Sequence, residues 1–145
     1  MEEDDNLLQS FKIIKIIYMA LGAGMIMSSV IFMFLVQSGN AAMNPGLADI
    51  LKIVVPVIAV GGFAAGRFLY KTSGKKSKEE MNQSIKINNY RTACLIVWAT
   101  LEGSGLFSSV AYFITGNQLF LVFFGMIFMG YLFSKPAITK FQQDF

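Results

Sequence analysis

A single carboxyl group, that of Glu102, is the side chain in this sequence whose chemistry stands out. It lies inside a long apolar stretch, about ten residues from its start, and a helical rise of about 1.5 Å per residue would place it near the middle of a bilayer. An ionised carboxylate at that depth costs from about 2.5 to more than 10 kcal/mol, so such residues are rare and are usually functional. Desolvation favours the protonated form, and a protonatable acid can bind a proton or a sodium ion. Glu102 is therefore the first candidate for a functional site.

Three hydroxyl groups near Glu102 could complete an ion site. Ser109 follows it by about two helical turns, and Thr100 and Ser108 lie on neighbouring faces of the same stretch. Three roles stay open for the carboxyl: ion or proton binding, a structural hydrogen bond between helices, and recognition of a partner within the membrane. Arg67 could neutralise the carboxyl, but it lies near the end of its own apolar stretch, where long cationic side chains extend outward.

The composition excludes several kinds of site. The chain has no histidine and one cysteine, Cys94, which excludes a disulfide framework, a Cys/His zinc site and a histidine-based catalytic centre. No paired acids and no nucleophile–base pair converge in the apolar stretches. We therefore expect a non-enzymatic protein with no metal site, no cofactor and no nucleic-acid partner.

Four apolar stretches must position these residues. Hydrophobic residues make up 54% of the chain and charged residues 14%, whereas soluble domains carry about 25% charged residues. A bilayer core of about 30 Å needs roughly 20 apolar residues in a helix. Stretches 16–36, 53–70, 93–114 and 118–134 reach or approach that length. The sequence predicts an all-α polytopic membrane protein, in which residues 1–145 form one domain with four transmembrane helices.

The cationic residues predict the orientation of these helices. Eleven of the twelve Lys and Arg residues lie near the N-terminus, in or next to segment 72–89, or near the C-terminus. Only Lys52 lies at the opposite ends of the predicted helices. The positive-inside rule then places both termini and a basic loop over 72–89 in the cytoplasm, with the protein in the cell (plasma or inner) membrane. The loop is expected to be a solvated anchor, or alternatively to bind anionic lipid through Lys75, Lys76 and Lys78.

Small residues recur at every fourth position of the apolar stretches, a spacing that lets helix backbones approach closely in lipid. The candidate packing residues are Ala20, Gly24, Ser28, Gly62, Gly66 and Ser104. They predict tight packing within the bundle or between copies of the chain. A weak repeat aligns residues 28–30 with 108–110, so two duplicated hairpins are a further hypothesis.

Two segments resemble parts of a known family. Residues 99–113 read ATLEGSGLFSSVAYF, and this segment resembles the carboxylate helix of the rotary ATPase proteolipids, the c-type subunits. In that family a mid-membrane acid is followed by small residues, an aromatic residue and an aliphatic run. The glycine-rich residues 61–66, GGFAAG, resemble its packing helix. The resemblance implies that Glu102 would be the ion-carrying carboxylate.

Two functions follow from these features. The leading hypothesis is a small non-enzymatic membrane protein that packs into a homo-oligomer or into a larger membrane complex. The alternative is a proton- or sodium-binding proteolipid-like subunit, or a small carrier, that uses Glu102.

Overall fold

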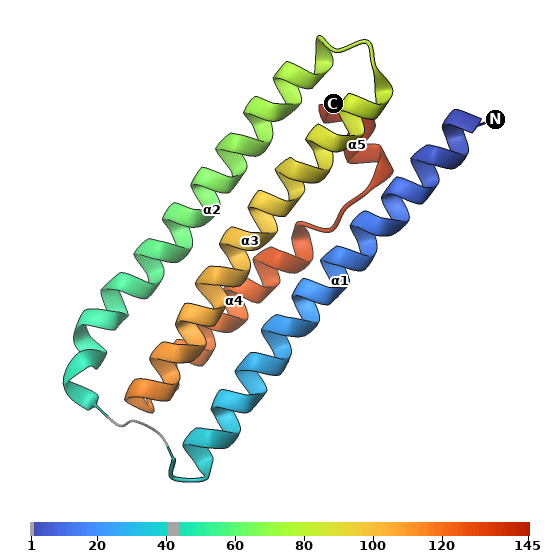
Figure 1. Ribbon diagram of the computed structural model, residues 1–145. Coiled ribbons are helices and arrows are strands. Elements are labelled where there is room, and N and C mark those ends of the chain that lie inside the picture. The colour runs from blue at the N-terminus through green and yellow to red at the C-terminus, as the bar shows by residue number, and fades with distance from the viewer. Residues whose placement is uncertain (1, 41–43) are drawn as a thin grey trace.

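The chain folds into helices only, in the part that a computed structural model describes, residues 2–40 and 44–145. The helices are α1 (Glu2–Gln37), a 3₁₀ turn η1 (Pro45–Leu47), α2 (Ala48–Lys78), α3 (Gln83–Thr115), α4 (Leu119–Phe133) and α5 (Ile138–Asp144) (Figure 1). The expected all-α class is confirmed.

Three of these helices are long and apolar enough to cross a membrane: Leu7–Gln37 within α1, Ala48–Lys78 and Gln83–Thr115. Helix α4 has 15 residues, which is about 22 Å of helix and less than a bilayer core of about 30 Å. It continues, after a bend of 76°, into α5. The described chain therefore has three candidate spans, or four if the bent α4–α5 pair counts as one.

Helix α3 is the centre of the bundle. Helices α1, α2 and α4 pack around it, with α1 and α2 on opposite sides and α4 on a third (Figure 1). Half of its most apolar window is buried, whereas only 6% of the corresponding window of α2 is buried. Most of α2 and much of α1 would therefore face lipid, or other proteins, in a membrane.

This arrangement bears on the hypothesis of two duplicated hairpins. Helices α3 and α4 pack together as a hairpin, and Gly116 ends α3 in the left-handed region, with a φ of 68° that favours glycine. Helices α1 and α2, by contrast, are separated by α3 (Figure 1). Each half of the chain therefore consists of two helices that run in opposite directions, but only the helices of the second half pack against each other as a hairpin.

The basic segment expected as a loop over 72–89 is mostly helical. Helix α2 runs on to Lys78 and α3 begins at Gln83, which leaves 79–82 as the connection. Three of residues 72–78 are lysines, which are good helix formers, and adding turns to a helix that has already formed avoids the cost of nucleation. The Asn82 side chain accepts a hydrogen bond of 2.9 Å from the Ser84 N–H and so caps α3. We call the end of the bundle that carries this connection and α5 the basic end.

Candidate functional site

Glu102 lies on the side of α3 that faces α1. Its Oε1 atom is 3.6 Å from the position that a Cβ on Gly24 would occupy. The side chain is half-buried, between the α3 backbone and the small residues of α1. The carboxyl therefore lies over Gly24, where a methyl group would be in ordinary van der Waals contact with it and a larger side chain would compete for its place.

The three hydroxyls expected beside Glu102 point elsewhere and donate to backbone carbonyls. Thr100 faces α2 and bonds to Val97 at 2.8 Å, and Ser109 bonds to Gly105 one turn earlier at 3.1 Å. Ser108 reaches across to α4 and bonds to Phe120 at 2.6 Å. A shift of two positions turns a side chain by about 200° and a shift of six by about 240°, so Thr100 and Ser108 leave the face of Glu102. Ser109 is seven positions away, which keeps it near that face but about 10 Å farther along the helix axis. The structure thus does not bring Thr100, Ser108 or Ser109 into a hydrogen bond with Glu102.

No other described residue forms a hydrogen bond or an ion pair with the Glu102 carboxyl. The ion pair seen in the described ranges joins Lys52 to Asp49, at 2.9 Å. Arg67 points into a different part of the bundle, with its guanidinium 6.0 Å from the centre of the Phe63 ring. Every fully buried side-chain N or O atom in residues 7–40, 44 and 46–145 has a hydrogen-bond partner. The Glu102 oxygens have none, so they reach the bundle surface.

The surface around this carboxyl is made of small side chains. We call it the Glu102 face, and it consists of Ala20 and Gly24 on α1 together with Ala99, Glu102 and Gly103 on α3. The four small residues are exposed, and a Cβ on Gly103 would meet no atom within 4 Å. Each helix contributes two small residues at a spacing of four, the spacing found where transmembrane helices approach closely.

The other candidate packing residues belong mainly to the α2–α3 contact. A Cβ on Gly66 would lie 3.0 Å from the Thr100 Oγ1 atom, and a Cβ on Gly62 would lie 3.5 Å from the Ser104 hydroxyl. Ser28 instead bonds to the Met25 carbonyl of its own helix, at 2.9 Å. The glycines of α2 therefore serve packing within the chain, whereas Ala20 and Gly24 lie on the open Glu102 face.

Sequence reasoning missed a pair of tyrosines that joins α1 to α4. The rings of Tyr18 and Tyr131 stack at a centroid distance of 4.7 Å and an interplanar angle of 4°. Each hydroxyl donates to the other residue's backbone carbonyl. Gly22 makes room for this pair, because a Cβ there would lie 3.0 Å from the Tyr131 ring. Tyrosines at the ends of apolar stretches were the available signal, but nothing in their spacing indicates which two meet.

The lysines considered for lipid binding divide between two surfaces. Lys75 and Lys78 line a small cavity of about 270 Å³ beside α5, and Lys76 lies exposed outside it. Cys94 is a buried free thiol. Within the described residues no three His, Cys, Asp or Glu side chains gather as a metal site would require.

Comparisons with protein-family models, with curated proteins and with solved structures give no match to this chain.

Proposed function

We propose that this protein is a non-enzymatic membrane component that assembles with a second copy of itself through the Glu102 face. One observation carries the proposal: an unpartnered carboxyl lies on an exposed surface of small residues, partway along the apolar stretch of α3. In hydrocarbon an unsatisfied polar group costs several kcal/mol. A neighbouring helix that supplies a hydrogen-bond partner removes that cost.

Symmetry explains how a second copy supplies that partner. In a two-fold dimer whose axis runs along the membrane normal, every residue lies at the same depth as its counterpart, and a residue close to the axis meets its own counterpart. The proposed axis passes beside Glu102. Glu102 of one copy then faces Glu102 of the other. Two protonated carboxyl groups can each donate to and accept from the other, so the pair is satisfied without any charge in the membrane.

The small residues of the Glu102 face favour the same arrangement. Association in lipid gains little from the hydrophobic effect, because lipid tails are as apolar as leucine, and it depends on close packing and on hydrogen bonds. The small side chains of this face let a facing helix approach until close packing and hydrogen bonding both contribute; they are Ala20, Gly24, Ala99 and Gly103. The basic end of the bundle would face the cytoplasm, as the distribution of Lys and Arg favours.

Two exposed glycines provide a matched experiment. A Cβ on Gly103, on the Glu102 face, or on Gly61, on the outer side of α2, would meet no atom within 4 Å, so a leucine fits the single chain at either position. We expect Gly103→Leu to convert dimers into monomers in a mild detergent, and Gly61→Leu to leave the dimer intact. The mass of the protein–detergent complex, from light scattering or sedimentation, measures the outcome. Monomeric wild type, or equal effects of the two variants, would contradict the proposal.

Proton or sodium binding by Glu102 is a second candidate function. It is supported by the surface access of the carboxyl and by the resemblance of residues 99–113 to the carboxylate helix of rotary ATPase proteolipids. A hydrophobic carbodiimide should then label Glu102, and sodium ions or raised pH should slow the labelling. Labelling that neither condition changes would exclude this candidate and leave the assembly proposal standing.

A further inference from the structure

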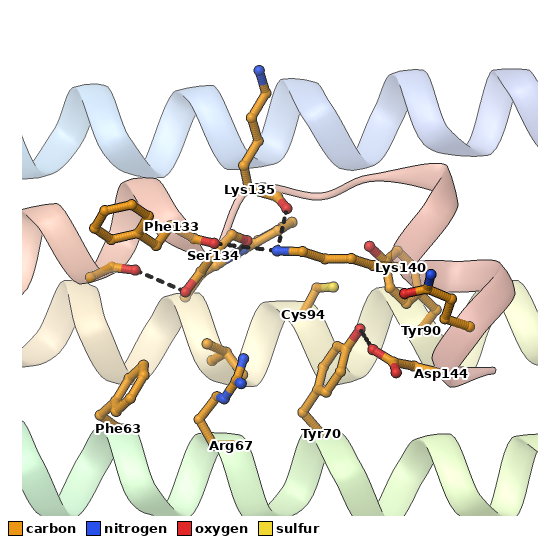
Figure 2. Close-up of a pocket in the computed structure, with 14 residues that line it drawn as sticks. Phe63, Arg67, Tyr70, Tyr90, Cys94, Phe133, Ser134, Lys135, Lys140 and Asp144 are labelled. Atoms are coloured by element: carbon orange, nitrogen blue, oxygen red, sulfur yellow. Dashed lines mark hydrogen bonds between the residues drawn. The ribbon is translucent and has the colours of Figure 1, made fainter.

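A cleft at the basic end lies outside the Glu102 face and has no role in the proposed assembly. It has a volume of about 520 Å³ and is bounded by α2, α3, the end of α4 and α5 (Figure 2). Pockets that hold small molecules usually measure about 300–1,000 Å³. The cleft is therefore large enough for a polar headgroup.

Two cations enter this cleft from opposite walls. Figure 2 shows Arg67 pointing in from α2 and Lys140 reaching in from α5. The Lys140 Nζ atom donates to the carbonyls of Phe133 and Lys135, at 3.3 and 3.4 Å. An ammonium group has three donors, so one is left for a ligand. Neither Arg67 nor Lys140 forms an ion pair in the described part of the chain.

The surroundings of the cleft are strongly positive. Asp144 is the one acid among the described residues that line it, and its Oδ2 atom accepts a hydrogen bond of 3.0 Å from the Tyr70 hydroxyl. The adjoining cavity of about 270 Å³ shares Arg67 and Asp144 with the cleft. Lys71, Lys75 and Lys78 also line that cavity. One carboxylate does not balance these cations, so the region attracts an anion.

The opposite end of the cleft is aromatic. Phe63 and Phe133 lie there, with 39% and 77% of their surfaces exposed. Helices α2 and α4 each pack on α3 and make few contacts with each other, so the cleft is open along the flank that would face lipid. A ligand that fills it must be anionic at the basic end and apolar toward the middle of the bundle.

We propose that this cleft binds an anionic phospholipid from the leaflet at the basic end. The lipid phosphate lies between the Arg67 guanidinium and the Lys140 ammonium, and the acyl chains run along Phe63 and Phe133. A free phosphate ester shares the headgroup chemistry, but it would leave the aromatic end of the cleft unfilled. The inference concerns a surface separate from the Glu102 face, so it stands or falls independently of the dimer.

The only tryptophan of the chain, Trp98, lines the cleft and reports its occupancy. The protein is placed in micelles that contain either phosphatidylglycerol or phosphatidylcholine with brominated acyl chains, at equal mole fractions. Bromine quenches tryptophan at short range, so a bound lipid lowers Trp98 fluorescence. We expect clearly stronger quenching by brominated phosphatidylglycerol than by brominated phosphatidylcholine.

Two variants and a control locate the binding. Arg67→Gln and Lys140→Gln should each reduce the preference for phosphatidylglycerol by roughly fivefold, the effect of one cation near an anionic surface. Arg67→Gln is the stricter test, because the guanidinium makes no hydrogen bond within the described chain, whereas Lys140 helps to hold α5. Arg91→Gln removes the same charge from an exposed site on α3 outside the cleft and should retain the preference.

Two kinds of result would overturn the inference. The first is the absence of a site-specific lipid preference, seen either as equal quenching of the wild type by the two lipids or as an equal loss of preference in Arg91→Gln and Arg67→Gln. The second is a change in Trp98 fluorescence on adding millimolar inorganic phosphate alone, without preferential quenching by phosphatidylglycerol. That result would assign the cleft to a soluble anion.

Discussion

The carboxyl of Glu102 lies directly over Gly24, with its Oε1 atom 3.6 Å from the position of a Cβ on that glycine. That distance is an ordinary van der Waals contact, so a methyl group fits there and a longer side chain does not. We expect Gly24→Ala to leave Glu102 accessible to a hydrophobic carbodiimide and Gly24→Leu to reduce its labelling severalfold. Mass spectrometry of the modified peptide measures both variants. Equal labelling of the two would place the carboxyl elsewhere.

The contact between α2 and α3 depends on Gly66. A Cβ there would lie 3.0 Å from the Thr100 Oγ1 atom and 3.3 Å from the Val97 Cα atom, so the backbones would have to separate. We expect Gly66→Ala to lower the free energy of unfolding by about 1–3 kcal/mol, the usual cost of overpacking. Denaturant titration in mild detergent measures the change. Gly61→Ala, on the exposed side of the same helix, should not lower it, because alanine at an exposed helical position is favoured over glycine by up to about 1 kcal/mol.

The reciprocal hydrogen bonds of Tyr18 and Tyr131 hold α4 against α1. Removing either hydroxyl, as in Tyr18→Phe or Tyr131→Phe, leaves the stacked rings and deletes one bond. We expect each variant to lose about 0.6–1.7 kcal/mol of the free energy of unfolding, the range found for hydrogen bonds between transmembrane helices. The same titration measures it, and a loss in neither variant would show that these bonds contribute nothing to the fold.

Helix α5 packs on a glycine of α2. A Cβ on Gly74 would lie 2.5 Å from the Asp144 carbonyl oxygen, which belongs to the backbone and cannot move alone. We expect Gly74→Val to displace α5 and to expose residues 138–144 to protease several times faster than in the wild type. Gly61→Val is the matched control on the same helix. Unchanged proteolysis of Gly74→Val would contradict the observed docking of α5.

The apolar stretches and the isolated carboxyl could be predicted because the bilayer imposes length and hydrophobicity on each span. The helical continuation of α2 to Lys78 could not, because the positive-inside rule concerns where cations lie and is silent on their secondary structure. Helix α5 was missed for a similar reason. Its seven residues are too few for a strong periodic signal, although Ile138, Phe141 and Phe145 follow a helical spacing.

The surroundings of Glu102 were harder to predict than its position. Proximity along the helix suggested Thr100, Ser108 and Ser109 as neighbours, but in the structure these side chains face α2, α4 or their own helix. Which face of α3 meets which neighbour depends on how α1, α2 and α4 pack around it, and the pattern of one helix does not contain that information. Gly24, which contacts the carboxyl, was expected to serve packing alone.

Cross-linking in native membranes tests the assembly proposal most directly. In a background in which the buried Cys94 is replaced by alanine, Gly103→Cys places a thiol on the Glu102 face, and Gly61→Cys places one on the outer side of α2. Under mild oxidation we expect Gly103→Cys to form a disulfide-linked species of twice the 16.0 kDa chain. Gly61→Cys should stay monomeric. Cross-linking through Gly61→Cys with none through Gly103→Cys would contradict the account.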